Sequence, residues 1–178
     1  TYTKAFGKMG YLTKLVAQLM RDLGSIPSPH NSYLLNLGLE SLHLRMAQHC
    51  RNAQQIAEFL EQQEQVAWIH YCGLKNDAHY SLGQKYLPNG SCGVIAFGLK
   101  GDRDTAIRFM DSLRLINIAT HVADSRTCVL HPASHTHRQL TDEQLRASGI
   151  DPTLIRLSVG IEDVTDLLAD IQQALAKC

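Results

Sequence analysis

Residues 154–159 constrain the fold most, because they place an arginine inside an apolar alternation, Leu-Ile-Arg-Leu-Ser-Val. Successive side chains of a strand point to opposite faces, so a strand here puts Ile155, Leu157 and Val159 on one face and Arg156 on the other. A guanidinium stays charged in proteins, and a half-buried one therefore needs an anion or a full set of hydrogen-bond acceptors. The segment thus predicts a strand with one face in the core and an anion-seeking group on the other.

Two kinds of partner for Arg156 follow from the residues alone. The first is a carboxylate of the chain itself, Glu162 or Asp124, in a structural ion pair. The second is the carboxylate of a ligand, because the planar fork of a guanidinium matches both carboxylate oxygens. The spacing slightly favours the structural pair and leaves both interpretations open.

The chain changes from helical to strand-like periodicity near residue 63. Apolar residues recur at helical spacing over 11–23 and 41–62, whereas short branched and aromatic runs alternate with helical patterns afterwards. We expect 1–62 to be a helical connecting portion and 63–178 an α/β (α+β) portion whose sheet is covered by helices. The pattern leaves open whether that sheet is mainly parallel or antiparallel. Strands are expected at 66–71, 92–99, 115–119, 127–130 and 154–159, and the later helices at 77–86, 101–112, 141–149 and 162–176.

Composition excludes some partners and favours a cytoplasmic location. The 17 Lys and Arg residues balance 17 Asp and Glu residues, so charge gives no reason to expect a nucleic acid or an anionic membrane as partner. The five cysteines are dispersed and odd in number, which indicates reduced thiols rather than disulfides. No apolar run has the length of a membrane span, and the start has no signal-peptide core. Because the chain begins at Thr1 without Met, we expect it to be the interior of a longer polypeptide.

A histidine cluster spans residues 131–137 in the pattern His-x-x-x-His-x-His. Imidazoles this close to one another can hold zinc, and His121 or Asp124 would complete the set of ligands. However, Pro132 works against a helical placement of the first histidine, and no cysteine or carboxylate stands at a typical ligand spacing. We therefore expect histidines that satisfy backbone groups of the loop or border a polar cleft, and we predict no metal. A metal-binding or interaction module stays the alternative of another class.

A polar connection over 120–127 joins two of the predicted strands. Connections at strand ends are where α/β sheets present ligand-binding groups, although an ordinary surface turn is the alternative. The chain has no glycine-rich phosphate loop and no Ser/His/Asp order typical of a hydrolase. The candidate hydrogen-bonding residues of the connection are Thr120, His121, Asp124, Ser125 and Thr127.

Five segments together carry a highly specific combination of residues: 28–31 (SPHN), 38–42 (GLESL), 44–50 (LRMAQHC), 131–137 (HPASHTH) and 156–163 (RLSVGIED). They resemble the C-terminal part of the pyridoxal phosphate (PLP)-dependent enzymes of Cys/Met metabolism, and the likeness covers nearly the whole chain in order. Within that family, residues 2–7 and 120–137 look most like the O-acetylhomoserine sulfhydrylases. Methionine γ-lyase and the cystathionine γ-synthases and γ-lyases are similar alternatives.

The resemblance implies the small C-terminal domain of a fold-type-I PLP enzyme, residues 1–178, whose sheet has helices on one face and long helices before it. In such enzymes an N-terminal domain carries the Schiff-base lysine and most contacts to the cofactor. That domain is absent here, so no catalytic or cofactor-binding residue is assigned and the chain is expected to be inactive alone. The implied partners are its own N-terminal domain, an amino-acid substrate and, in the full-length enzyme, three further subunits of a homotetramer.

The implied activity is that of a transferase of methionine biosynthesis and transsulfuration. It makes homocysteine or methionine from O-acetylhomoserine and sulfide or a thiol, with PLP as the electron sink. The family's substrate-carboxylate arginine falls on Arg156, which would orient the amino acid without transferring a proton. A neighbouring substrate contact, usually Ser or Asn, falls on His121, and Thr136 lies in a segment that borders the same pocket. The implied substrate-binding residues are therefore Arg156, His121 and Thr136.

Overall fold

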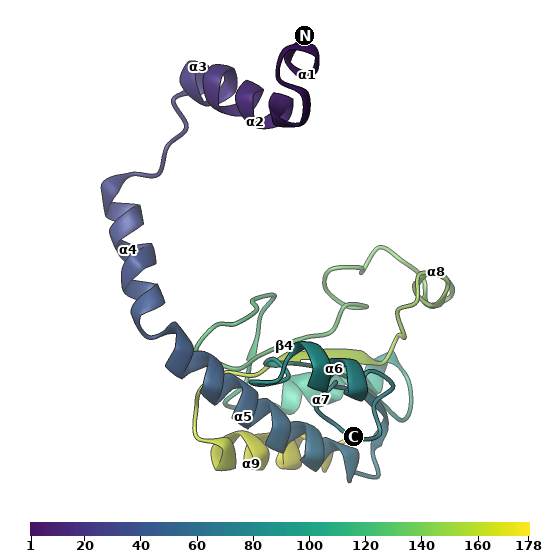
Figure 1. The fold of residues 1–178 in the computed structure, drawn as a ribbon. Coiled ribbons are helices and arrows are strands. Elements are labelled where there is room, and N and C mark those ends of the chain that lie inside the picture. Colours follow the sequence, from purple (N-terminus) through teal and green to yellow (C-terminus); the bar gives the residue numbers. More distant parts are fainter. The chain divides into compact units, whose positions relative to one another are not determined.

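The computed structural model describes residues 1–178, and its contacts divide the chain into two compact units, Thr1–Leu42 and His43–Cys178 (Figure 1). The division that we expected, at residue 62, stays a prediction about the organisation of the whole protein. None of the helices combines the length and the apolar character that crossing a bilayer requires.

The first unit consists of short helical segments. A continuous helical run covers the expected 11–23, and Gly24 ends it in the left-handed conformation, with φ 67°. Ser28 caps the next helix by accepting a hydrogen bond of 3.1 Å from the Asn31 N–H, with Pro29 in the first turn. The segments are α1 (Tyr2–Phe6), a 3₁₀ turn (Gly7–Met9), α2 (Gly10–Lys14), a π-helical segment (Leu15–Met20), α3 (Arg21–Leu23) and α4 (Pro29–Glu40).

The apolar side chains of this first unit are almost all exposed. Gly10 is its only buried residue, whereas Leu23 and Ile26 each expose about three quarters of their surface. The unit therefore has helices but no hydrophobic core of its own.

The second unit is built on a five-stranded sheet with the order β1-β2-β5-β4-β3. All neighbouring pairs are antiparallel except β3 and β4, which answers the question of strand direction that the sequence left open. The strands are β1 (Val66–His70), β2 (Val94–Leu99), β3 (Asn117–Ile118), β4 (Cys128–Leu130) and β5 (Leu154–Ser158). The helices are α5 (Leu42–Glu61), α6 (Tyr80–Tyr86), α7 (Arg103–Ser112), α8 (Asp142–Ala147) and α9 (Val164–Leu175).

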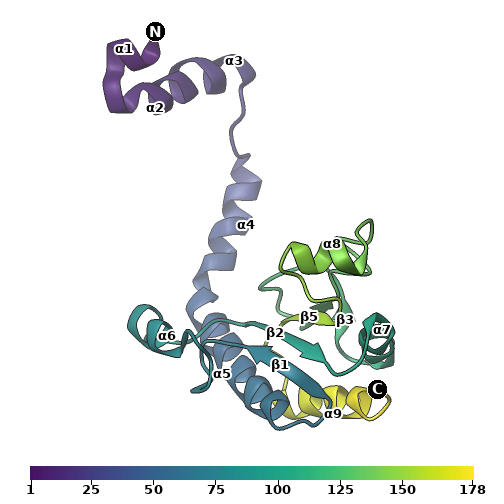
Figure 2. The ribbon, with the colours of Figure 1, turned by 90° about the vertical axis from the view of Figure 1, so that its right-hand side faces the viewer.

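Helices α5 and α9 lie along one face of the sheet, as both views show (Figures 1 and 2). Ile56 of α5 and Ile171 of α9 join Ile155 and Leu157 of the central strand β5 in one core, with 2% exposure or less. Arg156 lies between Ile155 and Leu157 in the sequence and is only half-buried, as period-two alternation predicts. The expected α/β domain with a small, helix-covered sheet is therefore confirmed.

A single carboxylate, Asp170 of α9, ties that helix to the segment before β3. It accepts hydrogen bonds of 2.9, 2.9 and 3.0 Å from the N–H groups of Arg114, Leu115 and Ile116. Because the carboxylate takes these donors, they cannot join the sheet, and the strand expected at 115–119 shortens to Asn117–Ile118. Burial alone would raise the pKa of Asp170, but the three N–H donors outweigh it and the pKa is lowered.

Replacing Asp170 by asparagine is expected to lower the free energy of unfolding by about 2–3 kcal/mol, because three N–H groups, one of them buried, lose a charged acceptor. The lowered pKa makes this contribution present above the ordinary Asp pKa of about 3.9 and lost as the pH falls through the folded-state value. Urea unfolding between neutral and acidic pH measures both effects. The matched variant Asp111→Asn, at an exposed position of α7, should change stability by less than about 0.5 kcal/mol. Equal losses in the two variants would contradict the assigned role of Asp170.

Candidate functional site

Arg156 occupies the middle of the sheet. It is paired with Ala96 of β2 on one side and with Leu130 of β4 on the other. Neither neighbour carries a charge or a polar side chain. The guanidinium therefore has to find its hydrogen-bond acceptors outside the strands.

The acceptors are backbone carbonyls of the 120–127 connection. Arg156 Nη2 donates to the carbonyl oxygens of Thr120, at 2.9 Å, and His121, at 3.3 Å, while the Nε–H is buried and has no partner. None of the five ion pairs in the chain includes Arg156. The structural pair with Asp124 or Glu162, which the spacing slightly favoured, is therefore wrong. Of the five N–H donors of a guanidinium, only the two of Nη2 are used, and no anion neutralises it.

Glu162 instead holds the end of the connection against the turn after β5. Its carboxylate accepts from the Thr127 N–H at 2.6 Å and from the Thr127 hydroxyl group at 2.8 Å, and Thr127 Oγ1 accepts from the Gly160 N–H at 2.8 Å. The close approach of the backbone at residue 160 to the 120–127 connection requires glycine, because a Cβ at Gly160 would lie 2.5 Å from the Ser125 carbonyl oxygen. These bonds fix where the connection leaves the sheet.

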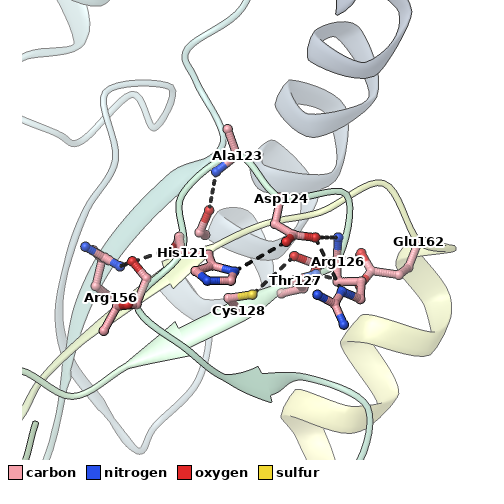
Figure 3. A network of polar contacts seen from close by, with 10 residues as sticks. His121, Ala123, Asp124, Arg126, Thr127, Cys128, Arg156 and Glu162 are labelled. Atoms are coloured by element: carbon pink, nitrogen blue, oxygen red, sulfur yellow. Dashed lines mark hydrogen bonds and ion pairs between the residues drawn. The ribbon is translucent and has the colours of Figure 1, made fainter. Parts of the chain in front are cut away.

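Asp124 organises the connection from within. It accepts from the Arg126 N–H at 2.9 Å and from the Arg126 side chain, and its other oxygen lies 3.4 Å from His121 Nδ1. The backbone N–H of Arg126 is the largest of the contributions that lower the pKa of Asp124 to about 2, so the group stays a carboxylate at neutral pH. In Figure 3 the His121 ring turns toward Asp124, while the guanidinium of Arg156 is drawn on the other side of His121.

Ala123 adopts a backbone conformation that few non-glycine residues adopt, with φ 60°. Its N–H donates to Ser158 Oγ at 3.1 Å, the dashed line drawn at Ala123 in Figure 3. Ser158 belongs to the same strand as Arg156. The left-handed residue lets the connection turn back over the sheet. The bond to Ser158 then holds the carbonyls of 120 and 121 in reach of the guanidinium.

Two polar residues of α5 that sequence reasoning missed support the same region. His49 Nδ1 donates to the Val159 carbonyl at 2.6 Å, and the Asn52 amide donates to the carbonyls of Gly160, at 3.1 Å, and Glu162, at 2.8 Å. Both side chains are at least 98% buried. The available signal was their spacing of three residues, which puts two polar groups on the apolar face of an amphipathic helix.

An apolar cavity of about 160 Å³ lies next to the connection, between α5, the start of β2 and the end of β5. Its walls include Met46, Cys92, Val122 and Ser158. Burial raises the pKa of the Cys92 thiol, which is therefore neutral. None of the seven lysines of the chain lines the cavity. The described residues thus offer an arginine for a carboxylate but no amine there for an aldehyde cofactor.

Side chains of the histidine cluster make hydrogen bonds within the chain. His131 is buried, its Nε2 donates to the Pro152 carbonyl at 2.7 Å and its Nδ1 lies 2.9 Å from Ser134 Oγ. Burial lowers the pKa of His131, so its ring is neutral. Nowhere in residues 1–178 do three His, Cys, Asp or Glu side chains gather in an arrangement that would hold a metal ion. Thr136 is exposed and lies 2.9 Å from His137 Nδ1, with no hydrogen bond to Arg156 or His121, so its role at the pocket stays a prediction.

The fold and this arrangement define a small α/β domain with a strand arginine that lacks a counter-ion beside a polar connection. The family model described as Cys/Met metabolism PLP-dependent enzyme matches residues 6–176, and the chain therefore belongs to that family. The resemblance inferred from the five sequence segments is confirmed.

Relatives in this family include O-acetyl-L-homoserine sulfhydrylase 1 of Thermus thermophilus, 41% identical over 174 residues, which cover 98% of this chain and 41% of that protein. L-methionine gamma-lyase of Pseudomonas putida is 44% identical over 170 residues, which cover 95% of this chain and 42% of that protein. A solved structure of a putative O-acetylhomoserine (thiol)-lyase from Campylobacter jejuni is also similar, with a TM-score of 0.84 and 36% sequence identity. The match covers 95% of this chain and 40% of that one, and that structure contains N'-pyridoxyl-lysine-5'-monophosphate. The chain thus spans about two fifths of the length of these relatives.

Two substitutions of Ala123 test the conformation of the connection. Ala123→Gly is expected to leave the free energy of unfolding unchanged or to raise it by up to about 1 kcal/mol, because glycine adopts positive φ without steric cost. Ala123→Val is expected to lower it by about 1–2 kcal/mol, because a β-branched residue is strained there. Urea unfolding of the two variants provides the comparison. Valine tolerated as well as glycine would show that residue 123 is not left-handed.

Proposed function

We propose that this chain supplies the substrate-carboxylate-binding part of a PLP-dependent O-acetylhomoserine sulfhydrylase, which makes homocysteine from O-acetylhomoserine and sulfide, or methionine when the sulfur donor is methanethiol. The observation that carries the proposal is the guanidinium of Arg156, whose buried Nε–H has no partner and whose charge no carboxylate of the chain neutralises. Leaving a buried donor without a partner is costly, so the site is expected to be completed by a ligand.

An α-carboxylate is the anion that suits these donors best. Within the chain the Nε–H and Nη1 make no hydrogen bond, whereas Nη2 is held by the carbonyls of Thr120 and His121. Because the Nε–H and Nη1 share no edge of the planar guanidinium, a carboxylate would bind at one of these two positions. Charge-assisted bonds from guanidinium to carboxylate are strong and directional. With Nη2 anchored, the ligand meets a guanidinium whose orientation is already fixed, which reduces the entropy lost on binding.

The role of Arg156 in this proposal is orientation. PLP supplies an electron sink for chemistry at the α-carbon of the amino acid when it is bound. The chain itself has no lysine at the cavity beside the connection, so the amine that holds the cofactor would come from residues outside it. Arg156 and the connection would fix the amino acid by its carboxylate and thereby present the α-carbon in one orientation.

His121 is the proposed second substrate contact. Its Nδ1 lies 3.4 Å from the Asp124 carboxylate. The resemblance to the family implies that His121 takes the position of a substrate contact that is usually Ser or Asn. With Nδ1 directed to Asp124, Nε2 remains for the substrate. Thr136 completes the proposed set, and a homotetrameric, cytoplasmic full-length enzyme remains part of the proposal.

A methionine γ-lyase is the second candidate. The observation in its favour is the 44% identity with the enzyme of Pseudomonas putida, compared with 41% for the Thermus thermophilus sulfhydrylase. Product analysis separates the two, because the lyase releases methanethiol from methionine whereas the sulfhydrylase forms homocysteine from O-acetylhomoserine.

The substitution Arg156→Ala tests the proposed role of the arginine. In the chain joined to the cofactor-binding part of a family enzyme, kcat/KM for O-acetylhomoserine should fall about 10²–10³-fold, because a desolvated carboxylate loses its charged partner. Arg156→Lys should recover only part of this, since an ammonium lacks the planar fork. The exposed Arg138→Ala should leave kcat/KM unchanged.

A direct measurement is made on the 178-residue chain alone. Adding O-acetylhomoserine should shift the ¹⁵N resonance of the Arg156 Nε–H, and the amide analogue of the amino acid, which lacks the carboxylate, should not shift it. Unchanged KM in Arg156→Ala, together with an unmoved Nε–H resonance, would remove Arg156 from substrate binding.

A further inference from the structure

A second cavity of the His43–Cys178 unit, of about 290 Å³, is separate from the Arg156 site. It is formed by β1, the turn between β2 and α7, helix α8 and the residues just before β5. No residue that lines it also lines the cavity beside the 120–127 connection. The proposed sulfhydrylase function makes no use of it.

One wall of this cavity is Trp68, the only tryptophan of the chain. Gly98 on the neighbouring strand lets the indole pack directly on the backbone, since a Cβ there would overlap the ring. The ring centroid of His70 lies 5.1 Å away. The indole N–H makes no hydrogen bond within the chain. Trp68 is therefore a fixed, half-buried aromatic surface with a free donor.

The carboxylates that line the cavity are all engaged by donors of the chain. Asp102 accepts from the Thr105 N–H at 3.0 Å, Asp142 accepts from Arg103 at 2.6 Å, and Asp151 accepts from the Thr153 N–H and hydroxyl group, both at 2.7 Å. Each of these bonds is local to a turn, a helix start or one ion pair. The carboxylates of the lining therefore have hydrogen-bond donors of the chain, and one of them, Asp142, is also paired with a cation, Arg103.

Two of the three cations that line the cavity have no partner within the chain. Arg103 is paired, but the side chains of Lys100 and Arg146 make no ion pair and no hydrogen bond. They come from different elements, the turn after β2 and helix α8, and border the same cavity as Trp68. Two unpaired cations beside a fixed aromatic surface match a ligand that has both a negative charge and a flat ring.

We infer that this cavity is a second ligand site, which binds a single flat ring bearing one anionic group, either a phosphomonoester or a carboxylate. The ring would stack on Trp68, and the anion would bind Lys100 and Arg146. A volume of about 290 Å³ is at the lower end for small-molecule pockets, which limits the ligand to about one ring. The inference does not depend on the proposed function, because it involves neither Arg156 nor the cofactor.

Because Trp68 is the only tryptophan, its fluorescence reports on this cavity alone. Phenyl phosphate or benzoate, added to the 178-residue chain, should change the emission in a saturable way, and the tighter of the two identifies the anionic group. Benzyl alcohol, which lacks the charge, and inorganic phosphate, which lacks the ring, should each bind at least about tenfold more weakly than the better probe.

The variants Lys100→Gln and Arg146→Gln should each weaken binding of the better probe about tenfold, because each removes one charge-assisted bond. The matched control is Arg138→Gln, a cation that is exposed and does not line the cavity. It should bind as the unmodified chain does. Both test positions are exposed, so folding should be retained, which circular dichroism checks.

Three results would overturn the inference. The first is the absence of a saturable change in emission with either ring anion at concentrations up to about 10 mM. A dissociation constant above this value would be weaker than that of a functional small-molecule site. The second is equal binding by benzyl alcohol or by inorganic phosphate alone. The third is unchanged affinity in both Lys100→Gln and Arg146→Gln, whereas weakening in either variant supports the site.

Discussion

A permanent positive charge on a central strand, between two antiparallel neighbours, is the constraint on which the region around β5 depends. The Arg156 guanidinium finds acceptors only in the carbonyls of Thr120 and His121. Its position and the conformation of the 120–127 connection are therefore coupled, because moving the connection would leave more buried donors unpaired. The left-handed Ala123, bonded to Ser158 of the same strand, makes the return of the connection over the sheet possible.

The carboxylates near this charge are used for other bonds. Glu162 holds Thr127, and Asp124 holds Arg126 and His121, so both stabilise backbone geometry rather than neutralise Arg156. Buried bonds from α5 to the turn after β5 strengthen the same arrangement. The consequence is a rigid surrounding for a cation whose own charge stays available, which is the condition for preorganised binding of an anion.

Much of the fold was predictable because local chemistry specifies it. Ser28 and Thr141, residue types that favour helix starts, accept the cap hydrogen bonds of α4 and α8, and Gly24 ends a helix in the left-handed conformation. The strand expected at 115–119 was too long, because the carboxylate of Asp170, more than fifty positions away, captures the N–H groups before Asn117. Single-sequence periodicity carries no information about such a distant acceptor, nor about the direction and order of the strands.

The sequence by itself determined that Arg156 lies on the face of β5 opposite the core, since alternation along a strand is a local property, and its motifs identified the family. Only the tertiary structure decided what the guanidinium touches. Asp124 and Glu162 were both candidate partners from spacing. However, Glu162 accepts a hydrogen bond from the Thr127 N–H, which folding brings near, and Asp124 accepts one from the N–H of Arg126 within its own turn. The meeting of Trp68, Lys100 and Arg146 at one cavity was likewise invisible in the sequence, because strand pairing and the packing of α8 bring together residues that are far apart along the chain.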